Sequence, residues 1–268
     1  MSDVILEIKG LTKTFNMGSV NQKTVLNGLN LQINRGDFIT VIGGNGAGKS
    51  TLMNAITGVF TCEAGEIKLN GEDITWLPEH KRAKYFGRVF QDPMLGTAPN
   101  MEIEENLALA YRRGKRRGLG WGVTKPEREI YREELAMLEL GLEDRMSSKV
   151  GLLSGGQRQA LTLLMATLVQ PEMLLLDEHT AALDPKTAKN VLDLTEKIVT
   201  ENNLTTLMVT HNMRDAIRYG NRLIMLDHGE IIFDISGEEK AALTVEALLE
   251  KFNTVSKGGV MSDRAILG

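Results

Sequence analysis

The residues with the clearest chemistry lie at 43–51, where the sequence reads GGNGAGKST. This is the pattern G-x-x-x-x-G-K-[ST] of a phosphate-binding loop, or P-loop. Its glycines are expected to take positive φ and let the backbone approach a ligand, so that successive N–H groups form an anion nest. Lys49 should reach the β- and γ-phosphates of a nucleotide, and the Ser50 hydroxyl should bind Mg²⁺. The predicted nucleotide-binding residues of the loop are Gly43, Gly44, Asn45, Gly46, Ala47, Gly48, Lys49, Ser50 and Thr51.

The residues around this loop argue against a chance glycine-rich turn. An apolar, β-branched strand is predicted at 38–42, and good helix formers follow at 51–56. A helix that starts near Lys49 adds the positive end of its dipole to the loop. The arrangement predicts nucleotide binding, and it does not say what hydrolysis would serve.

A second set of candidates follows two further predicted strands. Four apolar residues (173–176) precede Asp177 and Glu178, which is the Walker B arrangement. Asp177 is expected to face Mg²⁺, and Glu178 to polarise an attacking water. His211 ends a β-branched strand (205–210) of the same predicted sheet. A lone histidine is usually structural, but this position favours a contact with the γ-phosphate.

The stretch LSGGQ (153–157) predicts a second anion-binding helix start. Ser154 is a good N-cap, and the glycines after it leave backbone N–H groups open to a ligand. One nucleotide in one P-loop does not require a second such site. The residues alone therefore leave this stretch unexplained.

Three features each leave two interpretations open. Phe15 ends a predicted strand, either as a core or edge aromatic or as a face for adenine. Gln91 ends the strand 86–90, either as a surface residue or as a sensor of the γ-phosphate. The basic, glycine-rich stretch 111–122 is either a solvated loop or a contact for lipid headgroups or a membrane partner.

Composition excludes several classes of protein. The chain has 268 residues, 42% of them apolar and 25% charged, which is ordinary for a globular α/β protein. A net charge of −4 gives no argument for a nucleic-acid partner. Cys62 is the one cysteine, so no disulfide framework forms, and a reducing cytoplasmic compartment fits. The longest apolar stretch, 160–169, is too short to span a bilayer, so a partner would hold the chain at a membrane.

These elements predict an α/β fold with a P-loop NTPase core. The β pattern of residues 3–40 predicts an N-terminal antiparallel β subdomain, and helical periodicity predicts an inserted α-helical subdomain at about 92–165. In the second of these helices, Tyr131, Leu135, Leu138 and Leu142 are expected to share one face. The whole ATPase domain is expected to cover 1–238, followed by a short C-terminal helix and tail at 239–268.

Taken together, the motifs resemble those of the ATP-binding subunit of an ABC transporter, over roughly residues 4–235. The resemblance rests on GGNGAGKST, Gln91, LSGGQ, LLLDE (174–178), ALD (182–184) and His211. Among these motifs LSGGQ, at this distance before a Walker B strand, is the most specific. The family would also explain the second anion site, because two such domains pair head to tail around shared ATP.

The resemblance implies a role for each matching residue. Ser154, Gly155, Gly156 and Gln157 would bind the γ-phosphate of the ATP held by the partner. Phe15 matches the adenine-stacking aromatic, Glu178 the catalytic base and His211 the switch histidine. Gln91 would couple the Mg²⁺ site to the membrane subunit, and Asp184 would link the two sites across the dimer.

The sequence departs from the family pattern at three positions. His179 replaces a proline, Ala181 a serine, and Asn212 an aspartate that follows the switch histidine. None of these changes removes a catalytic group, and the role of His179 is open. DEHTAALDPKTA resembles the importers that work with substrate-binding subunits, which are often assigned to amino acids, including aromatic ones.

This resemblance implies a peripheral protein at the cytoplasmic face of the cell membrane. Its expected partners are a second ATPase subunit, most simply in a homodimer, a transmembrane permease and, for an importer, a substrate-binding protein. The alternative is a soluble ABC-type ATPase, for example one of iron–sulfur cluster assembly. A chromosome or DNA-repair ATPase would need a long heptad insertion, and the sequence has none.

Overall fold

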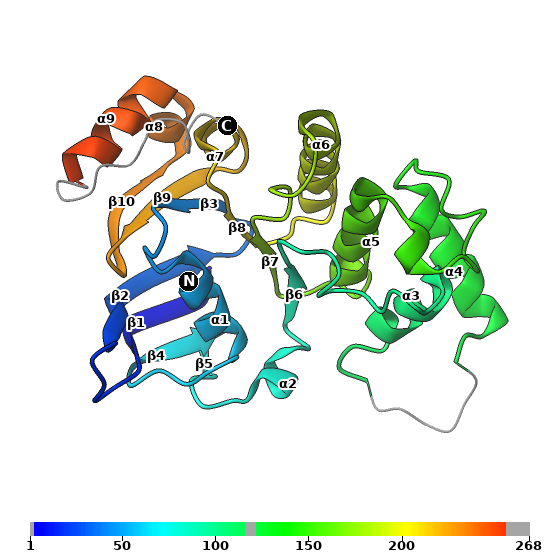
Figure 1. The fold of residues 1–268 in the computed structure, drawn as a ribbon, viewed down its shortest axis with the longest axis horizontal. Helices are drawn as coiled ribbons and strands as arrows, with labels where there is room; N and C mark the ends of the chain where they lie inside the picture. The colour runs from blue at the N-terminus through cyan, green and yellow to red at the C-terminus, as the bar shows by residue number, and fades with distance from the viewer. Residues whose placement is uncertain (1–2, 116–121, 256–268) are drawn as a thin grey trace. The chain divides into compact units, whose positions relative to one another are not determined.

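The computed structural model describes residues 3–115 and 122–255, which divide into two compact units. The first unit consists of Met1–Arg82 with Thr205–Gly268, and the second of Ala83–Leu204. Figure 1 labels the strands and helices of both along the chain. The sequence-based limits of the helical subdomain (92–165) and of the C-terminal segment (239–268) stay predictions.

The first unit contains an antiparallel sheet with the order β2-β1-β4-β5. Alternating residues of β1 and β2, such as Leu6 and Leu31, lie in the core, which is the period-2 pattern of a half-buried strand. Asn70 and Gly71 both take positive φ, 52° and 80°, and make the tight turn that Asn-Gly favours. The strands are β1 (Val4–Phe15), β2 (Lys23–Asn34), β4 (Ala64–Leu69) and β5 (Glu72–Asp73).

A second set of strands in the same unit has the order β10-β9-β3-β8. Strand β3 runs parallel to β8 and β9, and β10 closes the set antiparallel to β9. Residues 38–42 of β3 are all buried, as expected for a parallel strand that is covered on both faces. The strands are β3 (Phe38–Gly43), β8 (Thr206–Val209), β9 (Arg222–Asp227) and β10 (Glu230–Ser236).

Among the described residues, five helices belong to the first unit. Ile42 of β3, Met213 of α7, Met225 of β9 and Phe252 of α9 belong to one buried cluster, so the C-terminal helix is part of the core of this unit. The rest of the predicted tail, 256–268, lies outside the described residues. The helices are α1 (Lys49–Thr57), α2 (Glu79–Arg82), α7 (Met213–Arg218), α8 (Gly237–Ala241) and α9 (Val245–Val255).

The second unit combines a parallel strand pair with helices. Strand β6 (Phe86–Val89) pairs in parallel with β7 (Met173–Asp177), and the apolar residues 173–176 of β7 are fully buried. The helices are α3 (Ile103–Tyr111), α4 (Lys125–Ala136), the 3₁₀ helix η1 (Val150–Leu152), α5 (Gly155–Thr167) and α6 (Pro185–Glu201).

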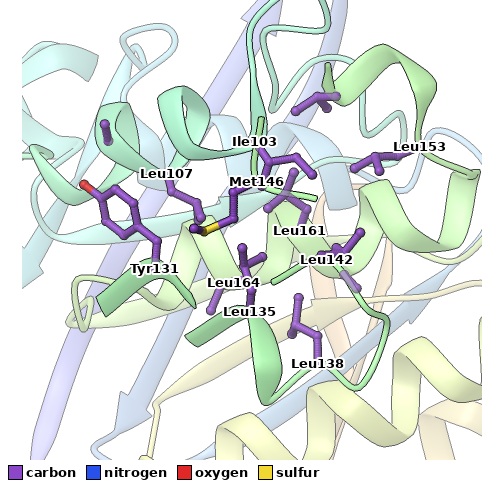
Figure 2. Close-up of a cluster of buried hydrophobic side chains, with 13 residues drawn as sticks. Ile103, Leu107, Tyr131, Leu135, Leu138, Leu142, Met146, Leu153, Leu161 and Leu164 are labelled. Atoms are coloured by element: carbon purple, nitrogen blue, oxygen red, sulfur yellow. The ribbon is translucent and has the colours of Figure 1, made fainter. Parts of the chain in front are cut away.

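Side chains from α3, α4 and α5 point toward one another in the core of this unit (Figure 2). Leu138 and Leu142 are buried there, as predicted, but not on a continuation of the α4 face. Helix α4 ends at Ala136, and Glu139 takes a positive φ of 57°, so both leucines reach the core from a loop. The labelled members are Ile103, Leu107, Tyr131, Leu135, Leu138, Leu142, Met146, Leu153, Leu161 and Leu164.

The described part of the basic stretch is not a simple solvated loop. Arg112 forms an ion pair with Glu127 at 3.0 Å. Arg113 donates to the carbonyl oxygen of Ala166 at 3.0 Å and to that of Val169, at the end of α5. These two arginines hold elements of their own unit together. Residues 116–121 of the stretch lie outside the described residues.

Within residues 3–115 and 122–255, no helix is both long enough and apolar enough to cross a bilayer.

Candidate functional site

The P-loop lies between β3 and α1, as predicted. Gly43, Gly46 and Gly48 take positive φ of 156°, 81° and 107°, whereas Gly44 does not, so its expected positive φ is wrong. A Cβ at Gly43 would lie 2.3 Å from the Leu226 carbonyl oxygen, and one at Gly48 would lie 2.8 Å from that of Val25. Backbone from the neighbouring strands β9 and β2 therefore fixes both positions as glycine.

Lys49 gives this loop its charge. Its side chain is only 7% exposed, and Nζ donates to the carbonyl oxygens of Gly43 at 2.8 Å and Gly44 at 3.3 Å. Lys49 is also the first residue of α1, whose first-turn N–H groups have no acceptor within the helix. A buried ammonium and a helix N-terminus in one loop make a strong anion site. Around it Asn45 and Ser50 are exposed, Ala47 is buried and Thr51 is half-buried.

Phe15 lies at the end of β1 and is half-buried. Its ring meets the ring of Phe60 edge-on, with centroids 5.5 Å apart, and the Lys13 ammonium lies within 5.4 Å of both ring centroids. Across the strand pair Phe15 faces Lys23, whose Nζ lies 3.4 Å from the position of a Cβ on Gly46. Phe15 therefore lies near the P-loop within one unit. Sequence reasoning missed Lys13, Lys23 and Phe60, because nothing in their spacing marks them.

His211 follows β8, which is parallel to β3 with Val41 opposite Val209. The histidine and the P-loop therefore leave the same edge of the sheet, and His211 is exposed. Asn212 accepts from the N–H groups of Arg214 at 2.9 Å and Asp215 at 3.3 Å. The departure at Asn212 thus serves as the N-cap of α7.

In the second unit, β7 delivers the two predicted carboxylates. The Asp177 carboxylate forms an ion pair with the Arg88 guanidinium at 3.3 Å, and both side chains are less than 15% exposed. Arg88 comes from the paired strand β6 and lies over the Phe90 ring, 4.6 Å from its centroid. Motif spacing does not reveal this pair, since 89 positions separate its members. Glu178 comes directly after β7 with a positive φ of 46°.

Gln91 is exposed and lies just after β6. The backbone beside it is fastened to α5, because the buried Gln159 donates from Nε2 to the Phe90 carbonyl oxygen at 3.3 Å. The strand end that carries Gln91 is therefore attached directly to α5. Gln159 is a further residue that the sequence analysis did not single out.

The LSGGQ stretch starts α5 with a capping box. The Ser154 N–H donates to Gln157 Oε1 at 3.1 Å, and the Gln157 N–H donates to Ser154 Oγ at 3.3 Å. A Cβ at Gly156 would lie 2.2 Å from Thr187 Cγ2, so this glycine also allows α5 to meet the start of α6. At that start the Asp184 carboxylate accepts from the Thr187 N–H at 3.1 Å, and its pKa is lowered by the Thr187 hydroxyl and N–H.

His179, the departure beside Glu178, is buried. Its Nε2 lies 3.2 Å from Thr195 Oγ of α6, and burial lowers its pKa to about 4.

The candidate residues thus divide between the two units. Phe15, the P-loop and His211 belong to the first, and residues 91, 154–157, 177, 178 and 184 belong to the second.

Comparison with known proteins places the chain in a family. The sequence model described as ABC transporter matches residues 26–181. The tyrosine transport ATP-binding protein of Clostridioides difficile (strain R20291) is 48% identical over 92% of this chain and 98% of that protein. A methionine import ATP-binding protein of Enterococcus faecalis is 35% identical over 85% of this chain, which spans 64% of that relative. A spermidine/putrescine import ATP-binding protein of Pasteurella multocida is 34% identical over 88% of this chain, which spans 59% of that relative.

Solved structures of ATP-binding cassettes are also similar to this chain. A dimeric, post-hydrolysis ATP-binding cassette bound to ADP and Pi has a TM-score of 0.74 at 32% identity, over 87% of this chain and 98% of that one. A nucleotide-free ATP-binding cassette from an ABC transporter has a TM-score of 0.77 at 26% identity, over 96% of this chain and 100% of that one. The predicted fold class and ATPase activity are confirmed. The chain belongs to the ABC transporter family and is one of its ATP-hydrolysing, ATP-binding subunits.

Proposed function

We propose that this chain powers the import of a small solute, and that the solute is an amino acid. The observation that carries the proposal is the 48% identity to a tyrosine transport ATP-binding protein along nearly the full length of both chains. Two other relatives carry the word import in their names. All three are named for transport, which disfavours the soluble iron–sulfur alternative.

In this proposal the first unit holds ATP. Lys49 binds the β- and γ-phosphates, the N–H groups of residues 43–51 surround them, and Phe15 stacks on the adenine. Support comes from the buried Lys49 ammonium at the start of α1 and from the placement of Phe15 near Gly46 through Lys23. Stacking of a base on an aromatic ring contributes about 1–3 kcal/mol.

The second unit supplies the group that activates water. Glu178 is the general base in this proposal, because it extends from the carboxyl end of the buried strand β7. His211 contacts the γ-phosphate, and Gln91 responds to it and passes the change to the membrane subunit. The tether from Gln159 to Phe90 supports that relay, since it joins the strand end before Gln91 to α5.

Mg²⁺ accompanies the ATP in this proposal. The residues that would hold it are Ser50, Gln91 and Asp177, which offer the oxygen donors that Mg²⁺ prefers. Asp177 fits such a role, because its carboxylate lies at a strand end and already balances a positive charge from Arg88. Bound there, Mg²⁺ would neutralise charge on the phosphates.

The working form is a head-to-tail homodimer in this proposal. Each ATP lies between the P-loop of one copy and Ser154, Gly155, Gly156 and Gln157 of the other, with Asp184 linking the two sites. The dimeric cassette with ADP and Pi supports this arrangement. A transmembrane permease holds the dimer at the cytoplasmic face of the membrane, and a substrate-binding protein delivers the solute. Closure by ATP and opening after hydrolysis drive transport.

The test is to purify the tagged chain from detergent-solubilised membranes and measure its ATP hydrolysis. We expect a membrane permease to co-purify, and we expect hydrolysis in the reconstituted complex to rise with tyrosine but not with spermidine. Recovery without any membrane protein would reject the transporter, and stimulation by spermidine alone would reject the amino acid.

A further inference from the structure

The backbone at Glu178 is in a conformation that the surrounding structure has to enforce. A non-glycine residue with φ of 46° lies in the left-handed region, which is unfavourable unless its neighbours hold it there. The turn after it is closed by the Ala181 N–H, which donates to the Glu178 carbonyl oxygen at 3.0 Å. This bond lies within the turn, so another contact must fix the turn relative to the rest of the second unit.

The His179 side chain provides that attachment. It is 2% exposed, and its Nε2 lies 3.2 Å from Thr195 Oγ. The Thr195 hydroxyl donates its single proton to the Val191 carbonyl oxygen at 2.7 Å. Toward the ring it can therefore only accept, so His179 Nε2 carries the hydrogen and donates. The residue beside Glu178 is bonded to the middle of α6.

Helix α6 also meets the start of α5. Thr187, in its first turn, leaves no room for a side chain at Gly156, where a Cβ would lie 2.2 Å from Thr187 Cγ2. The proline of the family pattern would stiffen the backbone at position 179, but it has no hydrogen-bond donor with which to reach α6. With histidine there, one rigid helix connects the Glu178 turn to the LSGGQ stretch.

We propose that His179 is a positioning residue for ATP hydrolysis: its hydrogen bond to Thr195 fixes Glu178 relative to α6 and, through α6, relative to the helix start at 154–157. The inference rests on the proposed role of Glu178. It assigns a function to His179, which departs from the family pattern, and it makes Thr195 part of the same positioning contact.

The experiment measures ATP turnover and ATP binding of the full-length protein. His179→Leu keeps the buried volume and removes the donor, while Thr195→Val removes the acceptor. Each should lower kcat on the order of 10- to 100-fold, because a base that is displaced by about 1 Å loses alignment. The KM for ATP should change less than about twofold, because no residue of the P-loop is altered. The double variant should be no slower than either single variant.

Rescue and control variants separate positioning from general damage. His179→Gln keeps an N–H donor at a similar reach and should recover most of the kcat, as should Thr195→Ser. Thr167→Val removes a hydroxyl that bonds within α5 at 3.0 Å, and it should leave kcat unchanged. Melting temperatures of all variants show that each is folded.

The outcomes are distinguishable. If His179→Leu and Thr195→Val keep wild-type kcat while Glu178→Gln loses turnover, the inference is wrong and the proposed base stands. If KM rises in step with the loss of kcat, or His179→Gln restores nothing, a positioning role is likewise rejected. If Glu178→Gln itself turns over normally, the proposed base fails and this inference fails with it.

Discussion

Two helix starts in this chain are rich in glycine, and they are built differently. At the P-loop, backbone carbonyls of β2 and β9 exclude side chains from Gly48 and Gly43, and a buried lysine adds positive charge. At LSGGQ, the Thr187 side chain of α6 leaves no room for a side chain at Gly156. Ser154 and Gln157 cap each other there.

The difference indicates how the two starts are used. The P-loop has both a nest of N–H groups and a cation, so it can hold phosphate within its own chain. The LSGGQ start has the N–H groups, but the basic residue of its first turn, Arg158, donates to the carbonyl oxygens of Gly151 and Leu153 before the helix. The position of this start follows α6, which Gly156 meets at Thr187. It is suited to complete a site on an anion that is already held elsewhere, which is what the proposed dimer requires.

The largest effects are expected at Lys49 of the P-loop and at the proposed general base, Glu178. Lys49→Ala should abolish ATP binding, because it removes the cation of the loop. Glu178→Gln should retain binding and lower turnover by ~10²-fold or more, as loss of an aligned general base does. Binding is measured by calorimetry and turnover by phosphate release.

Two results would contradict these expectations. Equal loss of ATP binding in both variants would show that Glu178 acts in holding the nucleotide. Unchanged hydrolysis in Lys49→Ala would reject the P-loop assignment.

The next effect concerns the contact between α5 and α6. Gly156→Ala should lower the free energy of unfolding by about 1–3 kcal/mol, because its Cβ would overlap Thr187 Cγ2. Gly155→Ala is the matched control, since its nearest neighbour, Leu183 Cδ2, would lie 3.2 Å away, and it should change stability by less than about 1 kcal/mol. Thr187→Ser removes Cγ2 and should restore the Gly156→Ala protein in urea unfolding. A Gly156→Ala protein that Thr187→Ser does not restore would contradict the contact.

A smaller effect is expected at the Arg88–Asp177 pair. Arg88 and Mg²⁺ would compete for one carboxylate, so Arg88→Gln should lower the Mg²⁺ concentration for half-maximal hydrolysis about two- to fivefold, the equivalent of a weak ion pair. Without Mg²⁺ the variant should also unfold at lower temperature, because Asp177 loses its counter-charge. An unchanged Mg²⁺ dependence would show that the pair and the cation do not share Asp177.

The smallest effect is expected at Tyr131. Its hydroxyl is buried without a hydrogen-bond partner among the described residues, and burial raises its pKa to about 12. Tyr131→Phe should therefore leave the free energy of unfolding unchanged or raise it by up to about 1 kcal/mol. The control Leu135→Ala opens a cavity in the same cluster and should cost about 2–5 kcal/mol. A loss of more than 2 kcal/mol in Tyr131→Phe would reveal a partner for the hydroxyl.

Much of the fold can be predicted from the sequence, because long periodic segments are readily recognised as strands or helices. The strand before the P-loop and the helix that starts at Lys49 are both where the sequence predicts them. Helices α7 and α8 were not predicted, since five or six residues carry too little periodicity to be recognised. Asn212, a good N-cap residue, was the available signal for α7.

Less of the candidate site than of the fold can be predicted from the sequence. Spacing identifies the P-loop, LSGGQ and the carboxylates after β7, because each motif is contiguous. The side chains that hold them come from elsewhere in the chain. Arg88 reaches Asp177 through the register of β6 on β7, and Thr195 reaches His179 from about three turns into α6. Such partners depend on pairing and packing, which spacing does not encode.

The most direct test of the account is the mass of the Glu178→Gln protein with and without ATP, measured by light scattering. If two copies share each ATP, the protein has twice the chain mass of 29.6 kDa with ATP and the single mass without it. No dimer forms when Ser154→Arg blocks the LSGGQ helix start. A Glu178→Gln protein that binds ATP and remains at the single mass, or that dimerises equally well with Ser154→Arg, would contradict the claim that the P-loop is half of a shared site.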